Sequence, residues 1–91
     1  MKSIWKFPLD IMDEQKVSMP DGSLILSVQV QNGIPCIWAM VDTGKPKIDR
    51  TFVIIGTGQL CDMDSLEFIG TFQMFDGNLV FHLFEKVADI G

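Results

Sequence analysis

The sequence predicts an all-β domain, a small barrel or sandwich of about six or seven antiparallel strands. Two turn signals lead to this prediction: Asn32-Gly33 lies between LILSVQVQ and IPCIWAMV, and Asp76-Gly77 lies between FIGTFQMF and NLVFHLF. An Asn-Gly or Asp-Gly pair readily adopts the two positive φ angles of a type I′ turn, and the flanking runs are rich in Val, Ile, Phe and Trp. Each segment is therefore predicted to be a β-hairpin.

The other elements follow from apolar runs and the turn residues between them. Short strands are predicted at residues 4–7, 15–19 and 51–55, the first ended by Pro8 and the second by Pro20-Asp21-Gly22. The hairpins cover 24–41 and 68–84, a polar loop covers 42–47, and 87–91 form a loose tail. Residues 60–66 are an irregular connection or one helical turn, and a short helix at 10–16 or 62–66 would give the alternative α+β fold. Residues 1–91 are expected to form one domain.

The turns also predict which side chains face the core, because a two-residue turn fixes the register of its strands. In the first hairpin, Leu24, Leu26 and Val28 are expected opposite Val41, Ala39 and Ile37. In the second, Gly70, Phe72 and Met74 are expected opposite Leu83, Phe81 and Leu79. The predicted core is Leu24, Leu26, Val28, Ile37, Val41, Phe52, Ile54, Phe72, Phe81 and Leu83.

The opposite face of each hairpin mixes polar side chains with large apolar ones. The same register pairs Gln31 with Ile34, Gln29 with Cys36 and Ser27 with Trp38, and in the second hairpin Gln73 with Val80, Thr71 with His82 and Ile69 with Phe84. This mixture is typical of a subunit interface or a shallow ligand site, and a solvated face with scattered apolar residues is the alternative. The candidate partner-binding or ligand-binding residues are Gln29, Gln31, Trp38, Thr71, Gln73 and His82.

The sequence contains no recognisable catalytic or metal-binding motif. His82 is the one histidine, and no carboxylate is expected beside it on the neighbouring strand to orient it as a base. Asp62, Asp64 and Glu67 lack the spacing of a calcium loop. We therefore predict a hydrogen-bonded structural histidine and assign no catalytic residue, metal or cofactor.

Gly56-Thr57-Gly58, directly after the strand at 51–55, suggests an anion site. Glycines let backbone N–H groups approach an anion, and a threonine hydroxyl adds a further donor. The residues of this alternative site are Arg50, Gly56, Thr57 and Gly58, with Lys45 and Lys47 nearby. The segment lacks the lysine of a P-loop and the third glycine of a dinucleotide fingerprint, so a turn at the strand end is the competing interpretation.

Charge and hydropathy restrict the partners. The formal charge of −5 argues against binding to a nucleic-acid backbone, which needs clustered Lys and Arg. No run approaches the roughly 18 apolar residues that span a bilayer, and MKSIWKFPLD does not look like a signal peptide, so a cytoplasmic location without membrane contact is expected. Cys36 and Cys61 are then expected to be reduced structural thiols.

Four stretches resemble a family of small proteins of tailed bacteriophages and prophages: IWKFPL, ILSVQVQNGIPCIWAMVD, RTF followed by GTG, and FIGTFQM followed by GNLVFHLFE. The resemblance implies an accessory protein acting in an infected bacterial cytoplasm, and it brings no catalytic residues. The leading hypothesis is a non-enzymatic, homo-oligomeric protein that binds and blocks a host defence protein. The alternative is a binder that sequesters an immune nucleotide signal, with Trp38 or Trp5 stacking on the base and Arg50 holding phosphate.

Overall fold

The computed structural model describes residues 1–87, which form seven antiparallel strands. The strands are β1 (Lys2–Pro8), β2 (Glu14–Pro20), β3 (Leu24–Gln31), β4 (Ile34–Asp42), β5 (Lys47–Gly56), β6 (Leu66–Met74) and β7 (Leu79–Lys86). The all-β prediction is confirmed: the described residues contain no helix, and hence none that could cross a membrane. Residues 60–65 are an irregular connection, and most of the predicted tail, residues 88–91, lies outside the described residues.

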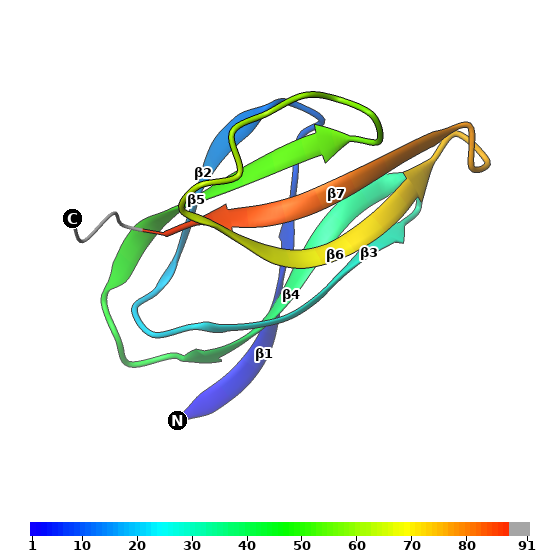
Figure 1. Cartoon of the computed structure of the whole chain (residues 1–91). Helices are drawn as coiled ribbons and strands as arrows, with labels where there is room; N and C mark the ends of the chain where they lie inside the picture. Colours follow the sequence, from blue (N-terminus) through cyan, green and yellow to red (C-terminus); the bar gives the residue numbers. More distant parts are fainter. Residues whose placement is uncertain (88–91) are drawn as a thin grey trace.

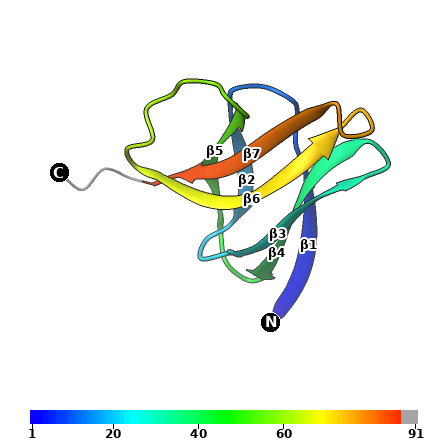
Figure 2. The same ribbon diagram turned by 45° about the vertical axis from the view of Figure 1, so that its right-hand side comes forward.

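The strands form two sheets that pack as a sandwich-like fold, and they do not close into a barrel. One sheet has the order β1-β4-β3 and the other has the order β2-β5-β7-β6. Each predicted hairpin therefore belongs to a different sheet, β3–β4 to the first and β6–β7 to the second. Figures 1 and 2 show that the turns of the two hairpins lie at the same end of the molecule.

Both hairpin turns have the backbone geometry that their sequences predict. Asn32 and Gly33 have φ angles of 51° and 78°, and Asp76 and Gly77 have φ angles of 56° and 84°. Two successive positive φ angles are the mark of a type I′ turn, whose twist matches that of the flanking strands. The turns therefore fix Gln31 opposite Ile34 and Met74 opposite Leu79, as expected.

The predicted register is correct next to each turn and fails beyond a β-bulge in each hairpin. Leu26 is an extra residue in β3, so Ile25 lies opposite Ala39 and Leu24 lies opposite Met40. A bulge moves the following side chains to the other face, because side chains alternate along a strand. The prediction of Leu24 and Leu26 as core residues is therefore wrong: they are 55% and 46% exposed.

A matching bulge at Ile69 shifts β6, so Phe68 lies opposite Phe84, where Ile69 was expected. Ile25 and Ile69 instead pack against the core, as does the half-buried Phe81. The other predicted core residues are buried, together with several side chains that the hairpin register did not include. The buried cluster consists of Leu9, Met19, Val28, Ile37, Ala39, Val41, Phe52, Ile54, Phe72, Met74 and Leu83.

The two sheets approach most closely where β3 passes over β6. A β-carbon built on Gly70 would lie 2.8 Å from Cγ1 of Val28, closer than real β-carbons come to another side chain. Val28 is only 5% exposed, so its side chain has little room to move. The glycine thus allows the β3–β4 hairpin to sit against the β6–β7 hairpin.

Candidate functional site

The six predicted partner-binding residues lie on two separate surfaces. Ile37, Ala39 and Val41 are buried in the core, so Trp38 points to the outer face of the three-stranded sheet. By the same alternation, His82 points to the outer face of the four-stranded sheet, because Leu83 is buried. Gln29 and Gln31 share the face of Trp38, and Thr71 and Gln73 share the face of His82.

The first surface, called here the Trp38 face, consists of Ile4, Lys6, Leu24, Ser27, Trp38 and Met40. Cross-strand pairing arranges these residues in two rows over β1, β4 and β3: Ile4, Met40 and Leu24 in one, Lys6, Trp38 and Ser27 in the other. Ile4 is 60% exposed and Leu24 is 55% exposed, while Trp38 and Met40 are half-buried. An apolar strip therefore crosses the whole sheet beside a tryptophan.

Polar side chains border the Trp38 face. Lys6 Nζ donates a hydrogen bond of 2.7 Å to Oε1 of Gln31, which holds the lysine across the end of the sheet. Cys36 is buried next to this border, and its thiol donates to the carbonyl of Ile34 at 3.5 Å. An apolar centre with a hydrogen-bonding rim is the composition of protein–protein contact surfaces.

The second surface is organised by His82. Nε2 of its ring lies 2.7 Å from Oγ1 of Thr57, and Nδ1 lies 2.8 Å from Oγ1 of Thr71, so both ring nitrogens are hydrogen-bonded to hydroxyls. The predicted hydrogen bonding of the histidine and its predicted neighbour Thr71 are both present. No carboxylate contacts the ring among the described residues, and the two threonine hydroxyls hold its orientation.

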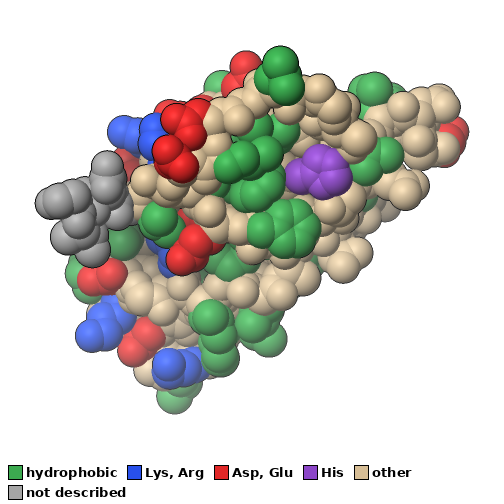
Figure 3. Space-filling view, viewed as in Figure 1, with side chains coloured by type: hydrophobic (Ala, Val, Ile, Leu, Met, Phe, Trp, Pro, Cys, Tyr) green, Lys and Arg blue, Asp and Glu red, His purple; other side chains and the backbone are tan. Residues whose placement is uncertain are grey.

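An aromatic pair lies beside this histidine on the same face. Phe68 and Phe84 pack edge to face with their ring centroids 5.5 Å apart, and Phe68 is 61% exposed. Ile55, directly opposite His82, is buried although it lies on the outer side of the sheet. Figure 3 shows hydrophobic side chains gathered next to the purple histidine.

A groove of about 550 Å³ separates the two hairpin turns. Gln73, one of the six predicted binding residues, lies in its wall, and Met74 also lines it with 7% of its surface exposed. The most unusual wall residue is Phe75, which is 65% exposed and has a φ of 55°. A bulky residue in this left-handed conformation costs roughly 1–2 kcal/mol, and its exposed ring recovers little of that by burial.

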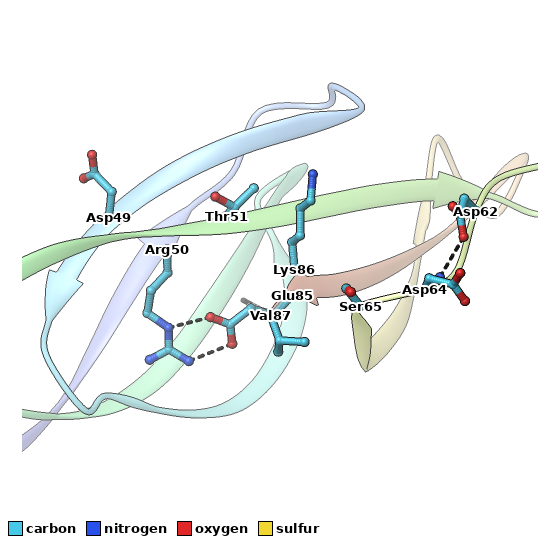
Figure 4. Close-up of a pocket in the computed structure, with 9 residues that line it drawn as sticks. All are labelled: Asp49, Arg50, Thr51, Asp62, Asp64, Ser65, Glu85, Lys86 and Val87. Atoms are coloured by element: carbon cyan, nitrogen blue, oxygen red, sulfur yellow. Dashed lines mark hydrogen bonds and ion pairs between the residues drawn. The ribbon is translucent and has the colours of Figure 1, made fainter. Parts of the chain in front are cut away.

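A cleft of about 720 Å³ opens beside residues 49–51 of β5. Figure 4 shows its floor, where Arg50 forks onto Glu85: Nε donates to Oε2 at 2.6 Å and Nη2 donates to Oε1 at 2.7 Å. Arg50 Nη1 also donates to the carbonyl oxygen of Ser23. The bond to Glu85 stabilises the charged guanidinium and holds the pKa of Arg50 above its ordinary value.

The residues of the anion hypothesis do not come together. Arg50 and Gly56 are six residues apart on β5, which corresponds to about 20 Å of extended strand. The N–H of Gly56 donates to Oε1 of Gln59, and the N–H of Thr57 donates to the carbonyl of Val80. The first donor therefore closes the turn, the second bonds to β7, and the guanidinium is engaged with Glu85.

Comparison with known proteins gives a family without an assigned activity. No curated protein and no solved structure matches the chain. Residues 1–90 match the family described as "Domain of unknown function (DUF7352)". Because the match extends over nearly the whole chain, this protein belongs to the DUF7352 family.

Proposed function

We propose that this protein is a non-enzymatic binding protein that engages a protein partner through the Trp38 face. The observation that carries the proposal is the apolar strip of Ile4, Met40 and Leu24 beside Trp38, open to solvent across all three strands. Tryptophan and methionine are enriched at contact surfaces, and a half-buried tryptophan beside an apolar strip is typical of an interface centre.

The resemblance to tailed-phage proteins supports a bacterial host protein, such as a defence protein, as the partner. A second copy of the chain is the competing occupant of the same face, since a flat apolar sheet surface suits a symmetric dimer. The nucleotide-binding alternative has less support, because Arg50 is engaged with Glu85 and the amides of Gly56 and Thr57 already donate to Gln59 and Val80.

The test compares two equally exposed positions on opposite faces. Leu24→Lys places a charge on the Trp38 face, and Phe68→Lys places one on the His82 face; the two residues are 55% and 61% exposed. Both variants should unfold within about 5 °C of the wild type, because substitutions at exposed positions usually change stability little. Each tagged protein is incubated with bacterial lysate, and bound proteins are identified by mass spectrometry.

We expect a bound protein that Leu24→Lys loses and Phe68→Lys keeps. The mass of each purified variant, measured by sedimentation, distinguishes a host protein from a second copy as the partner. If the wild type and Phe68→Lys are dimers and Leu24→Lys is a monomer, the Trp38 face binds a second copy. Capture that is equal in both variants, with an unchanged mass, would refute the proposal.

A further inference from the structure

The groove between the hairpin turns is a further surface, separate from the Trp38 face. Its walls come from both hairpins, Val30 and Gly33 from the first and Gln73 to Gly77 from the second. Figures 1 and 2 show the two turns side by side at one end of the sandwich. Its volume of about 550 Å³ lies within the range of roughly 300–1,000 Å³ found for ligand sites.

Three side chains give this groove a defined chemistry. The ring of Phe75 supplies an exposed aromatic surface, and Asp76 supplies a carboxylate on the adjacent residue. Asp76 makes no ion pair or side-chain hydrogen bond with any residue from 1 to 87. Gln73 adds an amide oxygen, which points toward the turn at Gly77. Asp76 is the one ionisable residue in the groove wall that the structure describes, so the ligand it complements is cationic.

The backbone of Phe75 gives a second reason to assign a binding role. Phe75, Asp76 and Gly77 all have positive φ angles, although a type I′ turn requires this only of the last two. A glycine or asparagine at position 75 would adopt this conformation more easily. A phenylalanine in this conformation, with its ring exposed, does little to stabilise the fold. A role in binding another molecule explains it better.

We propose that this groove binds an arginine side chain of an extended segment in a partner protein. A guanidinium stacks flat on an aromatic ring while its N–H groups fork onto a carboxylate, which is the combination that Phe75 and Asp76 offer. The amide oxygen of Gln73 accepts a further N–H. The apolar surfaces of Val30 and Met74 pack against the methylene groups of the arginine or against the residue next to it in the partner segment.

The probe is the blocked tripeptide acetyl-Leu-Arg-Leu-amide, titrated into the ¹⁵N-labelled full chain and followed by NMR. We expect shifts centred on the amides of Gly33, Gly77 and Asn78. The same peptide with citrulline, which keeps the shape of arginine without its charge, should bind at least tenfold more weakly. The lysine peptide should also bind more weakly, because an ammonium group does not fork onto a carboxylate.

Two substitutions test the residues without breaking the turn. Asp76→Asn converts an Asp-Gly turn into an equally favourable Asn-Gly turn, and Phe75→Asn places a residue that tolerates positive φ; each should weaken the arginine peptide at least tenfold. The matched control is Asp21→Asn, since Asp21 also precedes a glycine with positive φ and its loss changes the net charge equally. This control should leave the affinity within twofold.

Equal binding of the citrulline or lysine peptide would overturn the assignment, as would unchanged affinity in Asp76→Asn or shifts centred away from the two turns. Phe75→Asn should fold with unchanged or higher thermal stability, so its loss of binding would not reflect unfolding. Leu24→Lys should bind the arginine peptide normally, which separates this result from the test of the Trp38 face.

Discussion

Gly70→Ala tests the closest approach of the two sheets. The added methyl carbon would lie 2.8 Å from Cγ1 of Val28, a buried side chain on the facing strand. Forcing an extra methyl group into a packed core costs about 1–3 kcal/mol. Alanine offsets about 0.5–1 kcal/mol of this, because glycine loses more conformational freedom in a strand. The difference spans about 0–2.5 kcal/mol, so we expect a net loss of about 1 kcal/mol and a Tm lower by roughly 4–8 °C.

The assay is urea unfolding followed by tryptophan fluorescence, with calorimetry for the Tm. Gly44→Ala is the control: its β-carbon would meet only Oδ1 of Asp42, at an ordinary 3.6 Å, so stability should change by less than about 0.5 kcal/mol. In the double variant with Val28→Ala, the new methyl group occupies space that the valine vacates. The double variant should therefore be at least about 1 kcal/mol more stable than the sum of the single effects predicts. Additive effects, or a Gly70→Ala protein as stable as the wild type, would refute the close-approach argument.

Three further predictions concern polar contacts. Glu85→Gln should lower the free energy of unfolding in urea by about 1–3 kcal/mol, less than for a fully buried pair, because the side chains of Arg50 and Glu85 remain 19% and 13% exposed. Thr57→Val removes the hydroxyl at Nε2 of His82 and should cost about 0.5–1.5 kcal/mol in thermal unfolding, with a changed ring ¹⁵N spectrum. The pKa of Asp42 lies below its ordinary 3.8, chiefly because a backbone N–H donates to the carboxylate. Its contribution to stability is thus present above pH 3.8 and is lost as the pH falls through the folded-state pKa, and an NMR titration midpoint at or above 3.8 would contradict this.

The sequence predicted the hairpins well because their signals are local. An Asn-Gly or Asp-Gly pair selects its own backbone angles, and those angles set the register of the next few residues. The bulges at Leu26 and Ile69 were not predictable in this way, since LILSV and FIGTF each read equally well as uninterrupted strands. Each bulge exchanges one large apolar residue for another on the core side, Ile25 for Leu24 and Ile69 for Phe68, so the hydrophobic pattern carries no sign of the slip.

Contacts between segments far apart in the sequence are the other feature that the sequence does not predict. Arg50 and Glu85 are separated by 35 residues and meet only because β5 pairs with β7. Local patterns place Arg50 at the start of a strand and assign no partner to its charge, so they favour an anion site there. Strand order depends on how whole faces pack, and single-strand periodicity does not encode it.

Phe75 shows how a local rule and its violation together indicate a site. The Asp-Gly pair predicts positive φ at residues 76 and 77, and the same register places Phe75 in the last pair before the turn, where a strand conformation is expected. Its φ of 55° departs from that expectation, and its ring is 65% exposed, so neither turn chemistry nor core packing accounts for a phenylalanine there. Conflicts of this kind are expected to concentrate where a chain serves binding in addition to folding. The conflict falls beside Asp76, which forms no ion pair with any residue from 1 to 87, and within a groove that both hairpins line. It therefore favours this end of the sandwich as a contact surface.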